Sequence, residues 1–172
     1  MKKLMNGAQM KMIDVYSIQE VGIPSLVLME RAALCVTEAV LEKIKKTDKV
    51  LCVCGSGNNG ADGMAVARQL TERGISAEVY TTAEEGKGTE ELNRQRAILQ
   101  KLGIVFVNDI PAGEYNCIID AVFGIGLSRT ITGRYEQIIE KINAAKDTGS
   151  LIVAVDTPSG INAGDGQVMG CA

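Results

Sequence analysis

The feature that most constrains the fold of this chain is an apolar run that ends in a glycine-rich loop. Residues 50–54 read VLCVC, and residues 55–63 follow with GSGNNGADG. A segment with helical character, 64–73, comes next. A strand, a glycine turn and a helix in this order direct backbone N–H groups and a helix N-terminus towards an anion, usually a phosphate. The stretch therefore predicts a nucleotide-like ligand at the loop.

Strands and helices alternate after this point. We expect helices at 8–21, 25–46, 62–73, 89–102 and 133–146, and strands at 50–54, 77–82, 104–107, 117–123 and 151–156. The strands at 50–54, 117–123 and 151–156 are continuous apolar runs, which is typical of strands covered on both faces. The pattern predicts an α/β chain with a three-layer Rossmann-like fold, a mostly parallel sheet and helices on both faces. Ser25, just after Pro24, is the expected N-cap of its helix.

The chain is expected to form a single domain over residues 1–172, with N-terminal helices at 1–47 and a Rossmann-like core at 48–172. A chain of this length can bury about 70% of its unfolded surface. The sequence stops only a loop's length after the apolar strand 151–156. Because proteins rarely leave such a strand at an unprotected sheet edge, we expect the C-terminal strands of the fold to be missing.

Composition excludes several classes of protein. The net charge of −3 argues against non-specific nucleic-acid binding, which needs a basic excess. The chain has neither an apolar run of the ~20 residues that a membrane span requires nor a signal-peptide pattern at its start. The five cysteines are an odd number, and three of them lie in apolar runs, so we expect a reduced, cytoplasmic core rather than disulfides or a metal site.

The chain contains no histidine. Ser-His-Asp and Cys-His nucleophiles and His-based zinc chemistry are therefore excluded. Proton transfer must depend on Asp, Glu, Lys, Tyr, Cys or water.

Three strands deliver polar, glycine-marked loops to the carboxyl edge of the predicted sheet, where ligands bind in open α/β folds. These loops are 55–62, 120–130 and 156–162. Asp120 and Asp156 each end an apolar strand; each could instead be a capping or turn aspartate. Asn59 and Ser159 add neutral oxygens, which together with a carboxylate suit a hard, weakly charged cation.

Two further features of this edge bear on the ligand. Arg129 has two open interpretations, a phosphate contact and a solvent-facing side chain. The sequence at 55–60 fits the dinucleotide pattern G-x-G-x-x-G, but residues 79–82 read VYTT, without the acidic residue that binds the ribose in conventional dehydrogenases. The dehydrogenase interpretation is weakened accordingly.

Four blocks resemble the NAD(P)H-hydrate epimerase family, also described as the YjeF N-terminal domain. They are 23–32 (IPSLVLMERA), 57–63 (GNNGADG), 120–126 (DAVFGIG) and 155–160 (VDTPSG). The resemblance implies an isomerase of nicotinamide cofactor repair, which interconverts the R and S forms of hydrated NADH and NADPH. It also implies a homodimer and a partner dehydratase dependent on ADP or ATP, fused or separate.

The resemblance assigns roles to residues of the three loops. Substrate-binding residues would be Asn58, Asn59, Gly60, Ala61, Asp62, Gly124, Ile125, Gly126, Leu127, Ser128, Arg129, Thr130 and Asp156. One potassium ion per subunit would be held by Asn59, Asp120 and Ser159. Asp156 would lie at the reacting ring as the catalytic residue.

The side-chain inventory agrees with such a reaction. A hydroxyl beside a ring nitrogen can be inverted by loss and return of water through an iminium-like cation, and a carboxylate such as Asp156 can serve both steps without histidine or redox chemistry. Ala61 departs from the family, which has glycine there; if the position requires a positive φ, alanine adds about 1 kcal/mol of strain. The alternative function is a catalytically silent nucleotide-binding or scaffold module of the same fold.

Overall fold

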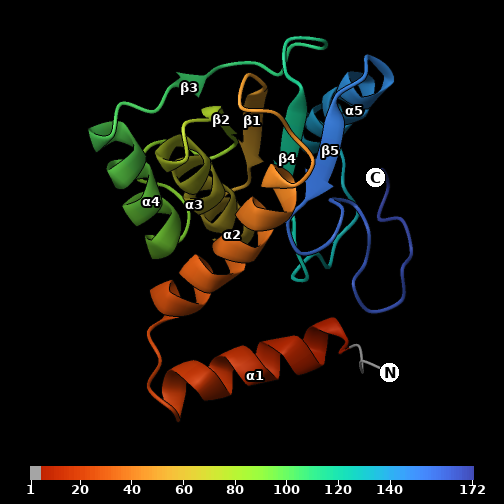
Figure 1. The fold of residues 1–172 in the computed structure, drawn as a ribbon. Helices are drawn as coiled ribbons and strands as arrows, with labels where there is room; N and C mark the ends of the chain where they lie inside the picture. Colours follow the sequence, from red (N-terminus) through yellow and green to blue (C-terminus); the bar gives the residue numbers. More distant parts are fainter. Residues whose placement is uncertain (1–4) are drawn as a thin grey trace.

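The computed structural model describes residues 5–172 of the chain, which form a parallel sheet with helices on both faces (Figure 1). The five strands lie in the order β3-β2-β1-β4-β5, and all their pairings are parallel. Their bounds are β1 Lys49–Cys54, β2 Ser76–Thr81, β3 Phe106–Val107, β4 Cys117–Ala121 and β5 Leu151–Ala154. The order reverses between β1 and β4, so a ligand crevice is expected at the carboxyl ends of these two strands.

Four helices cover the sheet and a fifth stands apart from it (Figure 1). Their bounds are α1 Gly7–Gln19, α2 Ser25–Leu41, α3 Asn58–Glu72, α4 Glu90–Lys101 and α5 Arg134–Asp147. Helices α2, α3 and α4 share one core cluster with the sheet, while α5 forms a second cluster on the other face. The predicted three-layer α/β fold is confirmed.

The central strands divide their side chains between these two clusters. Val50, Cys52 and Cys54 of β1 face α2 and α3, whereas Leu51 and Val53 face the α5 side. All five are fully buried. Because both faces of β1 are covered, each of these five positions is apolar, and this is why residues 50–54 read as a continuous apolar run.

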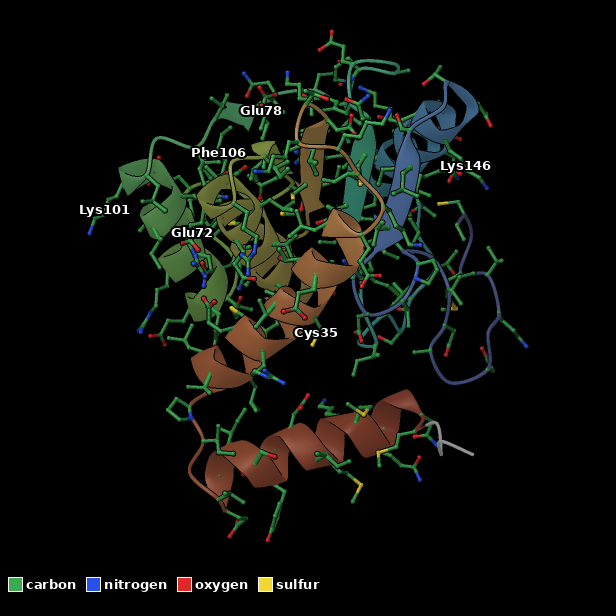
Figure 2. The ribbon with its side chains drawn as sticks, in the orientation of Figure 1. Cys35, Glu72, Glu78, Lys101, Phe106 and Lys146 are labelled. Atoms are coloured by element: carbon green, nitrogen blue, oxygen red, sulfur yellow. The ribbon has the colours of Figure 1, made fainter. Side chains whose placement is uncertain are left out.

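The cysteines divide into buried and exposed thiols. Cys52, Cys54 and Cys117 are buried in the core, where burial raises the pKa of each thiol, to about 12 for Cys117. Cys35 is exposed on α2 (Figure 2). Among the described residues, no cluster of three or more His, Cys, Asp or Glu side chains is placed to hold a metal ion. The buried cysteines therefore pack as small apolar side chains.

Two predicted helix ends differ from the structure. Ser25 is the first residue of α2 rather than its N-cap; Pro24 takes the cap position, and the Ser25 hydroxyl donates to Glu91 Oε1 of α4 at 2.8 Å. Helix α2 also ends at Leu41 rather than at the predicted residue 46, because the N–H groups of Lys43 and Ile44 both donate hydrogen bonds to the carbonyl oxygen of Val40. Such tightening of the last turn is a common way to satisfy terminal carbonyls.

A partly buried polar contact joins α2 to α3. The guanidinium of Arg68 donates to both carboxylate oxygens of Glu30, at 2.5 and 2.6 Å, and the amide of Gln69 donates to the same carboxylate at 2.9 Å. Hydrogen bonds between charged groups are shorter and stronger than those between neutral groups. The contact sets the position of α3, whose N-terminus carries the glycine loop.

Helix α1 lies below the carboxyl edge of the sheet in Figure 1 and contributes no buried residue. It joins α2 through residues 20–24, where Gly22 has a φ of +83°. In the part of the chain that the structure describes, no helix has both the length and the hydropathy of a membrane span.

Candidate functional site

The glycine loop after β1 is packed backbone against backbone. A methyl group on Gly55 would lie 2.0 Å from the carbonyl oxygen of Val122, and one on Gly60 would lie 2.0 Å from the carbonyl oxygen of Gly55. A side chain at either position would overlap main-chain atoms. These two glycines are therefore required by close approach, and they hold the loop against the end of β4.

The polar residues of this loop form the first turn of α3. The helix begins at Asn58, four residues earlier than predicted, with Gly57 as an N-cap that offers no side-chain hydrogen bond. The first N–H groups of α3 are thus left for a ligand, and the helix dipole favours an anion there. Ala61 lies inside the helix, and the only non-glycine residue with positive φ in the described chain is Asp156. Alanine at position 61 is therefore unstrained.

Asn59 and Asp156 meet at Gly124. A methyl group on Gly124 would lie 2.6 Å from Asp156 Oδ2 and 3.1 Å from Asn59 Oδ1. Within the described chain, both amide atoms of Asn59 are buried without a hydrogen-bond partner. Buried polar atoms are rarely left unpaired, so this pair of atoms marks a place for a ligand. Loops from three separate strands converge at this point.

The backbone holds Asp156 in an unusual conformation. Its φ is +71°, in the left-handed region that non-glycine residues seldom adopt. Asp156 Oδ2 accepts a hydrogen bond of 2.9 Å from the N–H of Ile125. Strain of this kind costs on the order of 1–3 kcal/mol and is concentrated at functional sites. The strained turn positions an exposed carboxylate beside the 124–130 loop.

Asp120 and Ser159 form a second, buried part of the site. Ser159 donates to Asp120 from its hydroxyl at 2.6 Å and from its backbone N–H at 2.8 Å. The Ser159 hydroxyl also accepts from the N–H of Phe123 at 2.8 Å. Burial raises the pKa of Asp120, and the hydrogen bonds from Ser159 and Val122 oppose that rise. These contacts join the ends of β4 and β5 next to Gly124.

Asp62 lies one turn after Asn59 on α3. Burial, followed by the negative charges of Asp156 and Asp14, raises the pKa of Asp62 from 3.8 to about 7. The site therefore contains two carboxyl groups in different surroundings, Asp156 exposed and Asp62 half-buried.

Asp62 gives the fold a specific pH dependence. Its raised pKa means that the folded chain binds more protons than the unfolded chain between about pH 4 and 7, so stability falls as pH rises through this window. We expect Asp62→Asn to raise the free energy of unfolding at pH 8 by on the order of 2 kcal/mol and to change it little at pH 4. Urea titrations at both pH values measure this. An equal effect at the two pH values, or one matched by the exposed control Asp165→Asn, contradicts the prediction.

The rest of the 124–130 loop faces α5. Leu127, Arg129 and Thr130 line a small hollow together with the ring of Tyr135, whose centroid lies 5.0 Å from that of Phe123. The lining includes neither Asn59 nor Asp156. Arg129 is exposed, as is Ser128, so the structure leaves both interpretations of Arg129 open.

One residue near the site has no signal in the sequence. Asp14 of α1 contributes to the raised pKa of Asp62, although 48 positions separate the two in sequence (62 − 14). Nothing in the pattern of residues 7–19 indicates a site, and only the path of the chain after α1 brings Asp14 to this edge.

Known proteins match this chain over most of its length. Residues 25–172 match the family described as YjeF-related protein N-terminus. An NAD(P)H-hydrate epimerase of Limosilactobacillus fermentum is 41% identical over 99% of this chain and 81% of its own length. One of Oenococcus oeni is 42% identical over 92% and 75%. The crystal structure of yeast ynu0 has a TM-score of 0.82 at 24% identity, covering 93% of this chain and 72% of that one, and it shows the same fold.

Proposed function

This chain belongs to the NAD(P)H-hydrate epimerase family, and we propose from this that its pocket around Asn59, Gly124 and Asp156 interconverts the R and S forms of hydrated NADH and NADPH. The chain is thus an isomerase of nicotinamide cofactor repair. The observation that carries the assignment of the pocket is the meeting of Asn59 and Asp156 at Gly124. The unpartnered amide of Asn59 and the exposed carboxylate of Asp156 both lie next to Gly124, which has no side chain to separate them.

Asp156 is the proposed acid–base residue. The hydroxyl of the hydrated ring leaves as water when it receives a proton, and the ring nitrogen's lone pair then forms an iminium-like cation. Addition of water to the opposite face, with loss of a proton to a carboxylate, gives the other epimer, so atoms and charge balance. A carboxylate near the ring also stabilises the cation electrostatically. The hydrogen bond from Ile125 fixes the direction of Asp156 during these steps.

The two loops would bind the dinucleotide. The uncapped N-terminus of α3, at 58–62, suits the pyrophosphate, and Gly124 of the 124–130 loop lies beside Asn59 and Asp156. Burial raises the pKa of Asp62 to about 7, and its protonated carboxyl group can donate a hydrogen bond there. These assignments to 58–62 and 124–130 follow the family resemblance.

Asn59, Asp120 and Ser159 fit a potassium ion. They offer an amide oxygen without a partner, a buried carboxylate and a hydroxyl, all hard oxygen ligands. A bound monovalent cation would offset the buried charge of Asp120 and attract the phosphates of the substrate. We also propose a cytoplasmic homodimer whose product passes to a dehydratase dependent on ADP or ATP, fused or separate.

The direct test of function follows one purified epimer of hydrated NADPH. We expect the chain to produce the other epimer, detected by chromatography, and we expect the rate to fall at least about tenfold when potassium is replaced with the larger tetramethylammonium. Equal rates in both salts would contradict the cation site alone. No second epimer at high enzyme concentration would instead favour a pocket that binds nucleotides without catalysis.

A second test adds one methyl group to the pocket. Gly124→Ala places a Cβ 2.6 Å from Asp156 Oδ2, so the carboxylate must move. We expect kcat/KM for epimerisation to fall roughly 10- to 100-fold, because a displacement of about 1 Å at a reacting group has this effect. The matched control is Gly164→Ala, outside the proposed binding loops, where the new methyl would approach only the side chain of Asn162, with Oδ1 at 3.1 Å. Equal activity of the two variants would place the reaction elsewhere.

A further inference from the structure

Helix α1 is the element that the core around the sheet does not explain. It buries no residue, and it precedes residue 25, where the family match begins. Several of its apolar side chains are exposed, among them Met10, Met12, Ile13, Tyr16 and Ile18. A helix with this much exposed apolar surface and no core contact has a partner that the sheet does not supply.

Two points on α1 fix its position relative to the site. At its start, a methyl group on Gly7 would lie 3.4 Å from Cβ of Ile125 and 3.6 Å from Cβ of Ala163. Further along, the charge of Asp14 acts on Asp62. The helix therefore runs from the 124–130 loop to the first turns of α3, across the carboxyl edge of the sheet (Figure 1).

These two points also define which side of α1 faces the site. Gly7 and Asp14 are two helical turns apart, and helical spacing puts Met10 and Ile18 on the same side. Met10 and Ile18 are 39% and 38% exposed, whereas Met12 and Tyr16 are 71% and 61% exposed and lie on the opposite side. The side of α1 that faces the site thus carries Met10 and Ile18 as apolar groups, beside the charged Lys11 and Asp14.

The connection from α1 to α2 turns at a single left-handed glycine. Gly22 has a φ of +83°, and nothing lies within 4 Å of where its Cβ would be. The N–H groups of Val21 and Ile23 donate hydrogen bonds to the carbonyl oxygens of Tyr16 and Ser17 at the end of α1. Pro24 is the N-cap of α2. Glycine adopts this left-handed conformation without strain, so the segment can direct α1 across the carboxyl edge of the sheet.

We propose that α1 is the outer wall of the substrate site, with Met10 and Ile18 closing over the bound dinucleotide. The proposal rests on the proposed function and extends it to residues outside the family segment. Such a wall would control the access of water to the reacting ring. The iminium-like cation must add one water molecule on the correct face, and an apolar wall limits the approach of other water molecules from bulk solvent. The substrate then covers the apolar side that the sheet leaves open.

A matched pair of substitutions on α1 tests this. Met10→Gln and Met12→Gln make the same change on the inner and outer sides of one helix, with little effect on helix propensity. We expect Met10→Gln to raise KM for hydrated NADPH at least fivefold, and Met12→Gln to leave KM and kcat within twofold of the wild type. Both variants should keep the wild-type melting temperature, since neither methionine is buried.

A second readout does not depend on turnover. Lys11 lies on α1 and is exposed, so trypsin can cut the free chain there. We expect hydrated NADPH to slow this cut in the wild type, and less so in Met10→Gln. The proposal would be overturned if Met10→Gln and Met12→Gln had equal KM values and equal rates of tryptic cleavage. It would also be overturned if Met12→Gln altered both KM and the molar mass in solution, because α1 would then contact a second copy of the chain. A wild-type chain without epimerase activity would instead refute the proposed function.

Discussion

Asp156→Asn should lower kcat for epimerisation about 1,000-fold, the loss expected when a general acid–base group is removed. The amide cannot protonate the departing hydroxyl or accept a proton from the returning water. Asparagine tolerates the left-handed φ of +71°, and its oxygen can still accept from the N–H of Ile125, so the fold should be unchanged. Single-turnover assays on one epimer, with thermal melting alongside, measure both effects.

The control for Asp156→Asn is Asp165→Asn, a change at an exposed aspartate of the chain's last hairpin. It should retain full activity. An Asp156→Asn enzyme of normal rate would remove Asp156 from the chemistry and leave Asp62 as the carboxyl group to test.

Gly60→Ala should have the largest effect on stability. Its methyl group would lie 2.0 Å from the carbonyl oxygen of Gly55, and neither backbone segment can move without separating α3 from the end of β1. We expect a loss of about 3 kcal/mol or more in the free energy of unfolding. For a chain of this size, that is a fall of about 6–12 °C in melting temperature.

Gly57→Ala is the comparison for Gly60→Ala in the same loop. Gly57 has a φ of −102°, and its added methyl would meet nothing within 4 Å. Its effect should stay within about 1 kcal/mol. If both substitutions are equally tolerated, the loop is not held by backbone contact as described above.

The fold was predictable because its signals are redundant. Apolar runs at β1, β4 and β5 identify strands covered on both faces, and this requires helices on both sides of a parallel sheet. The start of α3 was predicted wrongly because Asn58, Asn59 and Gly60 have poor helix propensity. Tertiary contact of Gly60 with Gly55 imposes the helical turn that the local sequence does not favour.

The sequence predicts at which edge of the sheet the site lies, but it does not predict the pKa of Asp62 or the position of α1. Parallel topology brings the carboxyl ends of β1, β4 and β5 to one edge, so the proximity of Asn59 to Asp156 follows from strand order. The raised pKa of Asp62 depends on burial and on the charges of Asp156 and Asp14, and Asp14 lies on α1, far away in the sequence. No local pattern encodes the angle at a left-handed glycine such as Gly22.

The distribution of thiols gives the molecule a natural attachment point for a probe. Alkylating reagents attack the thiolate, so the deeply buried Cys52, Cys54 and Cys117 are protected by both inaccessibility and raised pKa. Burial also raises the pKa of Cys171, near the end of the chain. Cys35 on α2 is exposed, so a maleimide dye can mark the native sequence there without engineering.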